Sequence, residues 1–339
     1  MRLPIFSSKR LGIDLGTSNS LVWSSGEGVV LSEPSVVAVD GNSGKVVAVG
    51  SSAHDMLGRT GSDLIAQKPL KDGVVADYLV CEAMLRYFMD KVLGSSRFWR
   101  PEVMICVPSG ITQVERRAVL EAALSAGAKV AYLIEQPLAA ALGAKVPIEA
   151  PHGSMVVDIG GGSTGAAVVS LGGVVVAATA RMGGNRIDEA IISYLRRTHN
   201  LIIGERMAED IKVNIGTALA AGPRKMIEAR GRDAILGLPK VVTVDSIEIA
   251  EAISGVLSSI VACVKNVLEQ TPPELASDII DRGIVMTGGS SQLRNLDKLI
   301  SSQTGVSAYV AENPMQCVVY GTGIALENID VWRKAVTRG

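Results

Sequence analysis

Two short stretches of this chain share an unusual pattern, in which an apolar strand ends in an aspartate and a glycine turn with small polar residues follows. The first stretch, Leu11 to Ser20, carries Asp14, and the second, Met155 to Thr164, carries Asp158 and three successive glycines. A buried strand that stops in such a turn leaves backbone N–H groups pointing at one spot, which suits a phosphate. Two copies predict two related domains that each offer one turn to a shared polyphosphate.

The composition is that of a globular protein with room for two hydrophobic cores. The chain has 339 residues, of which 47% are hydrophobic and 4% aromatic, and it has 36 glycines. This length and apolar content exclude global disorder and allow two domains of ordinary size. The net charge of −1 gives no electrostatic case for binding nucleic acid. The 4 cysteines are scattered without CxxC spacing, which argues against a metal cage or disulfide frame and fits a reducing cytoplasm.

The longest uncharged run, Ile159 to Ala180, has two interpretations. It is long enough to span a bilayer, but it contains Gly172-Gly173 between two valine-rich halves. Glycines this frequent cost helix stability and favour a tight turn, so we expect a strand hairpin. The N-terminal stretch Met1 to Phe6 has one charge and too short an apolar core for a signal peptide.

Several other segments carry clear local signals. Apolar residues at helical spacing predict a helix over Val80 to Val92. Thr112 and Glu115 are spaced as a capping box that opens a helix ending at Ala126. Ser246 to Gln270 is expected to form one or two helices. The region from residue 185 to 240 is expected to hold helices and a basic, glycine-interrupted segment, and a further helix is expected over Gln292 to Ser301.

Two large aromatic residues, Phe98 and Trp99, sit in a polar turn between Arg97 and Arg100. If they are exposed, they would form a wedge for a membrane or a partner. If they are buried, they would only anchor the loop, and the residues alone leave both interpretations open.

The two aspartates and the hydroxyls after them predict a site for a magnesium nucleotide. Asp14 and Asp158 can hold Mg²⁺ through its waters, while the turn N–H groups and the hydroxyls of Thr17, Ser18 and Ser163 take phosphate oxygens. The Walker signature is absent, and the three glycines do not fit the dinucleotide fingerprint.

Two further places could contribute to this chemistry. Gln136 follows the end of a predicted strand and can orient an attacking water, but glutamine is a poor general base, so hydrolysis would be slow. Glu209 and Lys212 lie three residues apart on one face of a predicted helix. They could contact the base or ribose of a nucleotide, or they could form an ordinary surface ion pair.

The order of the motifs resembles the superfamily of actin, sugar kinases and heat-shock chaperone ATPases, and longer stretches are similar to the MreB family of bacterial actins. The stretches that carry this resemblance are Asn19-Ser20, Glu33 to Ala38, Lys71 to Asp77, Val107 to Gly110, Met155 to Thr164, Asp188 to Tyr194 and Thr271 to Ala276. The resemblance implies an α/β protein with the actin-like ATPase fold, in which two duplicated ribonuclease H-like domains with inserted subdomains surround a nucleotide cleft. The first domain would comprise residues 1–149 and 315–339 with an insertion at 33–66, and the second residues 150–314 with an insertion at 182–244.

The resemblance also implies a function. The family's members bind ATP and Mg²⁺, polymerise into antiparallel double filaments on the inner face of the cell membrane, and hydrolyse ATP slowly as filaments turn over. These filaments organise peptidoglycan synthesis and cell shape together with MreC, MreD, RodZ and the RodA transglycosylase. A protein of this kind would be cytoplasmic and peripheral to the membrane.

The family's site residues carry over to matching positions of this chain. The nucleotide-binding positions are Thr17, Ser18, Asn19, Gly161, Gly162, Ser163, Glu209, Asp210, Ile211, Lys212, Gly288, Gly289, Ser290 and Ser291. Gln136 and Ser163 take the catalytic positions, and Asp14 and Asp158 face the metal through water. Phe98 and Trp99 fall where the family has a membrane-contacting loop, and Met1 to Phe6 would add a short amphipathic anchor.

The chain departs from the family pattern at a few positions. Gln136 stands where most relatives have glutamate, Ser163 replaces a threonine, and Gly165 replaces a glutamate. The third turn ends in Ser290 where relatives have a third glycine. Two other functions on this fold are less consistent with the sequence. A sugar kinase would need an acidic general base at the position that Gln136 occupies. A chaperone would need a peptide-binding domain after the ATPase domains, and the sequence to Gly339 contains no such domain.

Overall fold

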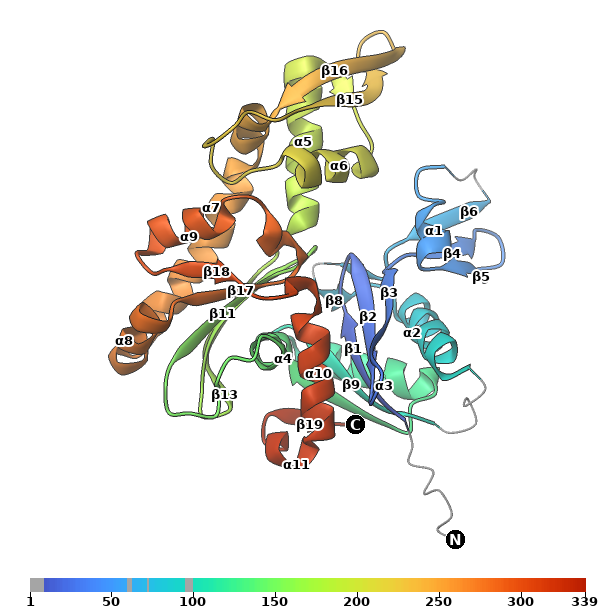
Figure 1. The fold of residues 1–339 in the computed structure, drawn as a ribbon. Coiled ribbons are helices and arrows are strands. Elements are labelled where there is room, and N and C mark those ends of the chain that lie inside the picture. Colours follow the sequence, from blue (N-terminus) through green and yellow to red (C-terminus); the bar gives the residue numbers. More distant parts are fainter. Residues whose placement is uncertain (1–8, 60–62, 72, 95–99) are drawn as a thin grey trace. The chain divides into compact units, whose positions relative to one another are not determined.

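The computed structural model describes residues 9–59, 63–71, 73–94 and 100–339. The chain forms two compact units, each with its own sheet and core (Figure 1). Unit 1 comprises Met1–Pro151, Val169–Val174 and Met315–Gly339, and unit 2 comprises His152–Val168 and Val175–Pro314.

Unit 1 is built on a mixed six-stranded sheet with the strand order β19-β10-β9-β1-β2-β3. Strand β1 is parallel to β9 and antiparallel to β2, and β9 is parallel to β10. The central strands read as continuous apolar runs because both faces of the sheet are covered. The strands are β1 (Arg10–Leu15), β2 (Asn19–Ser24), β3 (Gly28–Pro34), β9 (Glu102–Val107), β10 (Val130–Glu135) and β19 (Val336–Arg338).

Helices cover both faces of this sheet. On one face, α2 (Tyr78–Leu93) and α3 (Gln113–Ala126) bury their apolar stripes against β1, β9 and β10. On the other face, α10 (Cys317–Glu327) packs beside α4 (Gln136–Gly143) and against β1 (Figure 1). The short helix α11 (Ile329–Trp332) follows α10. The predicted helix over Val80 to Val92 is confirmed as α2.

A small insertion follows β3 and forms a three-stranded antiparallel sheet, β5-β4-β6. Glu33 ties it to the main part of unit 1, because its carboxylate accepts hydrogen bonds from the Ser51 backbone N–H (2.7 Å) and from the Lys91 ammonium (2.5 Å). Burial alone would raise the pKa of Glu33, but the bonds from Lys91 and Ser51 hold it below its usual value. The elements here are β4 (Val37–Asp40), β5 (Val46–Val49), α1 (Ser51–His54), β6 (Leu64–Gln67), β7 (Leu70–Lys71) and β8 (Val74–Val75).

Unit 2 is built on a five-stranded sheet with the order β13-β12-β11-β17-β18. The run that we expected to form a hairpin rather than a membrane helix is β12 and β13, joined by Leu171 and Gly172, which both have positive φ. The hairpin prediction is therefore confirmed. The elements are β11 (Ser154–Ile159), β12 (Thr164–Ser170), β13 (Gly173–Ala180), α5 (Gly184–His199), α7 (Ser246–Gln270), α8 (Pro273–Arg282), β17 (Ile284–Thr287), the 3₁₀ helix η2 (Gly289–Gln292), α9 (Leu296–Thr304), β18 (Ala308–Val310) and the 3₁₀ helix η3 (Pro314–Gln316).

Within the described part of the chain, α7 is the one helix long and apolar enough to cross a membrane, with a mean hydropathy of 1.8. Its apolar side chains, including Ile253, Leu257 and Val264, belong to the core of unit 2 together with β11 and α5. Length and composition also fit a core helix, and these contacts favour that interpretation.

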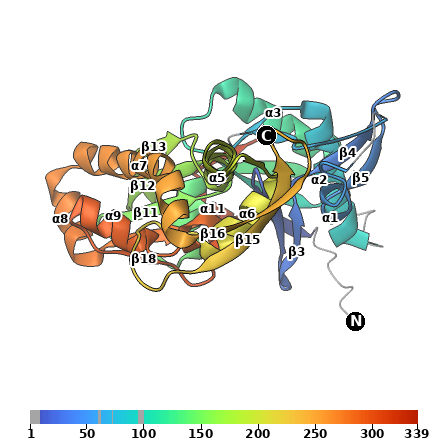
Figure 2. The same ribbon diagram turned by 90° about the horizontal axis from the view of Figure 1, so that it is seen from above.

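The second insertion contains a sheet that the sequence did not predict. Besides α5 and α6 (Glu205–Ile215), it has β14 (Leu201–Ile202), β15 (Met226–Asp233) and β16 (Pro239–Asp245), ordered β14-β15-β16. The expected basic segment of residues 222–225 leads directly into this hairpin, which Figure 2 shows from above. Strand β15 escapes detection because charged residues such as Glu228 and Arg230 occupy its exposed face, so few apolar residues mark the alternation.

The helix predicted over Gln292 to Ser301 begins later than expected. The structure has the 3₁₀ turn η2 first, and α9 starts only at Leu296. Asn295 adopts the left-handed conformation, which interrupts the helix, and the Arg294 guanidinium is drawn away to the carbonyls of Ile215 (2.8 Å) and Gly216 (3.0 Å).

The predicted capping box of α3 is present. The Thr112 hydroxyl accepts from the Glu115 N–H (3.2 Å), and the Glu115 carboxylate accepts from the Thr112 N–H (2.8 Å). We expect Thr112→Ala to lower the free energy of unfolding by about 1 kcal/mol, because one N–H at the helix start loses its partner. Urea titration would measure this loss. Thr112→Ser, which keeps the hydroxyl, should retain most of the stability, and an equal loss in both variants would contradict the capping role.

Candidate nucleotide site

The first glycine turn joins β1 to β2 in unit 1. Asp14 lies one residue before the end of β1, and its Oδ1 accepts a hydrogen bond from the Cys106 thiol on β9 (3.1 Å). A Cβ at Gly16 would come within 2.4 Å of the Asn19 carbonyl oxygen, so only glycine lets the chain turn this tightly. The Thr17 hydroxyl is buried and accepts from the Gly73 N–H (3.0 Å).

Ser35 supports this turn from behind. Its hydroxyl donates to the Gly16 carbonyl (2.5 Å) and lies 2.8 Å from the Ser20 hydroxyl, and its N–H donates to the Ser18 carbonyl (2.9 Å). Ser35 stands in a stretch that carried the family resemblance, but sequence reasoning assigned no role to its hydroxyl, because its partners lie 15 to 19 positions earlier in the chain. Ser18 is half-buried and Asn19 is exposed beside it.

Gln136 is the first residue of α4, directly after the end of β10 and directly before Pro137. The side chain of the preceding residue, Glu135, accepts a hydrogen bond from the Ser109 hydroxyl (2.7 Å). The acidic residue next to Gln136 is therefore held by a partner that sequence reasoning did not identify.

The second glycine turn joins β11 to β12 in unit 2, and its carbonyls point toward neighbouring elements. The Gly160 carbonyl accepts from the Gly184 N–H (3.0 Å) and from the Ser290 hydroxyl (2.9 Å), and the Gly161 carbonyl accepts from the Asn185 N–H (2.8 Å). Among the described residues, none accepts a hydrogen bond from the N–H of Gly161 or Gly162. Ser163 is buried at the end of this turn. Such N–H groups are what an anion requires of a glycine turn.

Asp158 is buried just before this turn, with 2% of its surface exposed. Its Oδ1 accepts a hydrogen bond from the Thr287 hydroxyl on the parallel strand β17 (2.8 Å), and the two residues are register partners. Thr287 precedes the third glycine turn, and sequence reasoning had not given it a role.

The third turn packs directly against the second. Gly288 has φ +82°, and a Cβ there would lie 2.4 Å from the Ile159 carbonyl oxygen. Gly289 is exposed, Ser290 binds the second turn, and the buried Ser291 hydroxyl donates to the Gly288 carbonyl (2.7 Å). The three candidate positions 288, 290 and 291 are thus parts of one structured turn.

The four candidate nucleotide-binding residues on α6 differ in how far they are buried. The Lys212 ammonium donates to the Asp188 carboxylate (2.8 Å) and to the Gly184 carbonyl (3.4 Å), and its side chain is 15% exposed. Ile211 is fully buried in the core of unit 2, whereas Glu209 and Asp210 are exposed. Lys212 therefore pairs with an aspartate of α5, a partner that spacing along α6 could not reveal.

Gly184 is the point where these segments meet. A Cβ there would lie 2.7 Å from the Ser290 hydroxyl, 3.3 Å from the Lys212 ammonium and 3.7 Å from the Gly161 Cα. The start of α5 thus brings the second turn, the third turn and Lys212 together within unit 2. The pair Gly183-Gly184 ahead of an amphipathic helix is the sequence signal that could have identified this junction.

The proposed membrane residues Phe98 and Trp99, and the segment Met1 to Phe6, lie outside the described residues.

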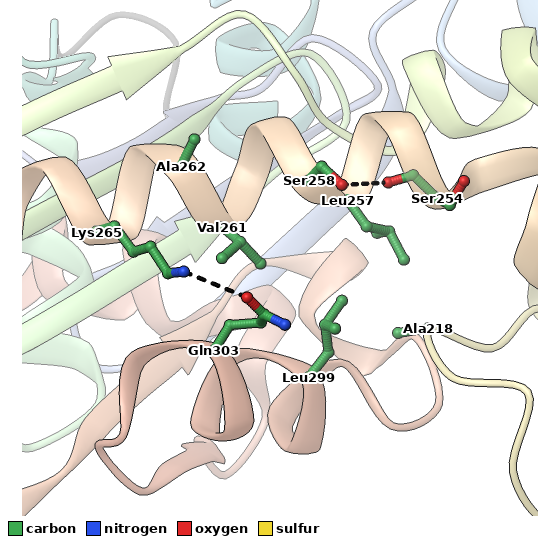
Figure 3. A pocket seen from close by; sticks show the side chains of 9 residues that line it. All are labelled: Ala218, Ser254, Leu257, Ser258, Val261, Ala262, Lys265, Leu299 and Gln303. Atoms are coloured by element: carbon green, nitrogen blue, oxygen red, sulfur yellow. Dashed lines mark hydrogen bonds between the residues drawn. The ribbon is translucent and has the colours of Figure 1, made fainter.

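A cavity of about 290 Å³ lies elsewhere in unit 2, between α7 and α9 (Figure 3). Leu257, Val261 and Leu299 line it, and the Lys265 ammonium donates to the Gln303 side chain (3.2 Å) at one end. It contains none of the glycine turns, and its single cation is already engaged by an amide. We therefore place the candidate nucleotide site at the turns rather than in this cavity.

The residues present in the turns fit a magnesium nucleotide. The carboxylates of Asp14 and Asp158 and the hydroxyls beside them are hard oxygen ligands of the kind that Mg²⁺ prefers, directly or through its waters. In unit 2, Gly184 is packed tightly against the Ser290 hydroxyl, the Lys212 ammonium and the Gly161 Cα, which holds the second and third turns together. The N–H groups of Gly161 and Gly162 are the donors that a phosphate would use there.

Comparison with known proteins identifies the family. A model of the family described as MreB/Mbl protein matches residues 8–334. The chain belongs to the MreB/Mbl family. Among its MreB/Mbl relatives, the cell shape-determining protein Mbl of Bacillus cereus (strain ATCC 10987 / NRS 248) is 49% identical over 331 residues, covering 98% of this chain and 99% of the relative. The cell shape-determining protein MreB of Escherichia coli (strain K12) is 52% identical over 330 residues, covering 96% of this chain and 95% of the relative.

Solved structures agree with this MreB/Mbl assignment. MreB5 of Spiroplasma citri bound to ADP superposes with a TM-score of 0.91 at 35% identity, covering 97% of this chain and 98% of that chain. The same protein bound to AMPPNP superposes with a TM-score of 0.91 at 36% identity, covering 97% of this chain and 98% of that chain. A chain of the MamK double helical filament, at 23% identity and a TM-score of 0.77 over 96% of this chain and 99% of that one, shows the fold alone. The predicted family and the predicted actin-like fold are both confirmed.

Proposed function

We propose that this MreB/Mbl family member binds ATP with Mg²⁺ and polymerises into filaments that determine cell shape. The observation that carries the proposal is the junction at Gly184, where two glycine turns and Lys212 pack together and the N–H groups of Gly161 and Gly162 have no acceptor among the described residues. The structures of MreB5 of Spiroplasma citri bound to ADP and to AMPPNP support binding of an adenine nucleotide. The names of the curated relatives support the cell-shape role.

Each group of residues has a proposed role in holding the nucleotide. The turns at Thr17 to Asn19 and at Gly161 to Ser163 would bind the phosphates, with Ser163 also acting in catalysis. Glu209 to Lys212 and Gly288 to Ser291 would bind the ribose and adenine. Asp14 and Asp158 would hold the waters of Mg²⁺, which shields phosphate charge when it is bound.

The domain partition that goes with this function is also a proposal. Residues 1–149 and 315–339 would form one actin-like domain with the insertion 33–66, and residues 150–314 the other with the insertion 182–244. This gives four subdomains, as expected for an actin-like ATPase.

The cellular role follows from the family. The filaments would be antiparallel double filaments on the inner face of the cell membrane, attached through Phe98 and Trp99, through Met1 to Phe6, or through both. They would organise peptidoglycan synthesis with MreC, MreD, RodZ and the elongation machinery. The protein would then be cytoplasmic and peripheral to the membrane.

The experiment that tests the function combines a binding and an assembly measurement. We expect the purified chain to bind a fluorescent ATP analogue in Mg²⁺ and to sediment with ATP, and lipid vesicles should increase the sedimented fraction. Negative-stain electron microscopy should show paired filaments. A phosphorylated small molecule in a kinase screen, without polymer, would instead support a sugar kinase.

Gln136 gives a prediction for the rate of hydrolysis. We expect Gln136→Glu to raise phosphate release by about tenfold, because a carboxylate can accept a proton from the attacking water whereas an amide can only orient it. A phosphate-release assay on sedimented polymer would measure the rate. Gln136→Ala is the control that removes the side chain and should slow release, and an unchanged rate in both variants would contradict the water-positioning role.

The tip of the β15–β16 hairpin gives a prediction for self-association. Ile235, Leu236 and Leu238 are 76%, 72% and 61% exposed, an unusual cluster for a free surface. Hydrogen bonds from the N–H of Leu236, from Lys240 and from the N–H of Ile235 hold the tip in one shape and lower the pKa of Asp233 to about 2. A rigid apolar tip suits contact with a second copy.

We expect Leu236→Glu to raise the critical concentration for ATP-dependent assembly at least several-fold, since a carboxylate in an apolar contact costs about 1–3 kcal/mol. Sedimentation over a concentration series would measure it. Leu79→Glu is the matched control, because Leu79 is 74% exposed and lies at the start of α2, where an acidic residue is tolerated. Equal assembly of both variants and the parent would rule out the hairpin tip as a contact.

A further inference from the structure

The two aspartates assigned to the metal share a feature of their surroundings. Asp14 Oδ1 accepts a hydrogen bond from the Cys106 thiol (3.1 Å), and Asp158 Oδ1 accepts one from the Thr287 hydroxyl (2.8 Å). In both units the donor comes from the neighbouring parallel strand rather than from the turn itself.

Strand register shows that the two donors occupy equivalent places. In unit 1, Ile13 on β1 pairs with Ile105 on the parallel strand β9, which sets Asp14 beside Cys106 one residue further. In unit 2, Asp158 on β11 pairs with Thr287 on the parallel strand β17. Each donor is therefore the residue level with the aspartate on the adjacent strand. Because the same hydrogen bond to an aspartate recurs in both units, we interpret it as a shared feature of the two glycine turns.

Burial makes the Thr287–Asp158 contact the more consequential of the two. Thr287 is fully buried, Asp158 is 2% exposed and Cys106 is 6% exposed, whereas Asp14 is half-buried. Water cannot easily replace a donor that is lost beside Asp158, so its carboxylate would rotate or take another partner. A hydroxyl donates a stronger hydrogen bond to a carboxylate than a thiol does, so the two contacts differ in strength.

We propose that Thr287 and Cys106 are positioning residues that orient Asp158 and Asp14 for the Mg²⁺ of a bound nucleotide, with Thr287 the stronger of the two. Each donor fixes one carboxylate oxygen and thereby sets the direction in which the carboxyl group faces the glycine turn. This inference rests on the proposed function, because the waters of Mg²⁺ are what an oriented carboxylate would bind.

The experiment measures nucleotide affinity with Mg²⁺ and with EDTA, and reports the ratio of the two dissociation constants. We expect the near-isosteric Thr287→Val to reduce the gain in affinity that Mg²⁺ provides by about tenfold, while affinity in EDTA changes little. Thr287→Ser, which restores the hydroxyl, should recover most of the gain. A purely structural role for Thr287 would instead weaken binding equally under both conditions, and that result would overturn the proposal.

The Cys106 variants test the same idea in the other unit. Cys106→Ala should reduce the Mg²⁺-dependent gain by about two- to threefold, and Cys106→Ser, a stronger donor of similar size, should match or exceed the parent. Because these variants are independent of Thr287, poor folding of Thr287→Val leaves the test intact. An unchanged ratio in Cys106→Ala would overturn the role of the thiol.

The parent protein separates this inference from the function on which it rests. Failure of the parent to bind the ATP analogue at all would overturn both. Binding of nucleotide by the parent, with Mg²⁺ ratios that none of the variants alters, would leave the nucleotide site standing and overturn only the positioning roles.

Discussion

Gly321→Ala is expected to destabilise unit 1 by about 3 kcal/mol or more, the largest effect of a single methyl group that we predict for this chain. A Cβ on Gly321 of α10 would lie 1.8 Å from the carbonyl oxygen of Ala139 in α4, and a Cβ on Gly143 of α4 would lie 1.7 Å from that of Cys317. The obstacle in both cases is backbone, which cannot rotate away as a side chain can. The two helices would have to separate, and α10 would lose its contact with the sheet.

The measurement is urea unfolding followed by tryptophan fluorescence, since Trp23 and Trp332 lie in unit 1 and a Cβ on Gly323 of α10 would come within 2.4 Å of the Trp23 ring. Gly255→Ala is the matched control. Gly255 also lies inside a helix, α7, but a Cβ there would meet nothing within 4 Å. Alanine should therefore stabilise α7 by about 1 kcal/mol through helix propensity. Similar stability of the two variants would show that α4 and α10 are not in close contact.

Gly288→Ala is expected to cost about 2–4 kcal/mol and to abolish nucleotide binding at micromolar concentrations. The residue has φ +82°, and a Cβ would lie 2.4 Å from the Ile159 carbonyl oxygen. Relief of that clash would push the third turn away from the second, and Ser290 would lose its bond to the Gly160 carbonyl. The same change would therefore damage both the packing of unit 2 and the turn proposed to bind the ribose and adenine.

Gly305→Ala is the control that separates the effect of a positive φ from the effect of the clash with the Ile159 carbonyl oxygen. Gly305 has φ +75° after α9, but a Cβ there would meet nothing within 4 Å, so alanine tests the backbone strain alone. We expect it to cost about 1 kcal/mol and to leave nucleotide affinity unchanged. Thermal unfolding and titration with a fluorescent ADP analogue would measure both quantities. Normal affinity in Gly288→Ala would mean that the third turn does not take part in binding.

Much of the local structure was predictable because it depends on residues close together in the chain. The Thr112–Glu115 capping box and the turn before Gly173 are decided by hydrogen bonds and backbone preferences over a few residues. The hairpin of β15 and β16 escaped prediction for the opposite reason. Charged residues occupy the exposed face of β15, so this strand lacks the alternating apolar pattern that identifies a strand.

The candidate site was predictable in part. Asp14, Asp158 and the glycines stand out because an aspartate before a glycine turn at the end of a buried strand is unusual. Their partners did not stand out, because a buried threonine or cysteine in an apolar strand, such as Thr287 or Cys106, looks like ordinary core. Only strand register places these donors beside the carboxylates.

By itself, the amino-acid sequence determined the turns that could hold a phosphate, because these depend on local backbone preferences. Its longer motifs carried the resemblance that indicated the family and the fold. The tertiary structure alone decided which side chains meet at those turns. Lys212 with Asp188, Ser290 with Gly160 and Thr287 with Asp158 are joined across 24, 130 and 129 positions of sequence. Such contacts are set by the packing of strands and helices, and the packing depends on the whole core of each unit.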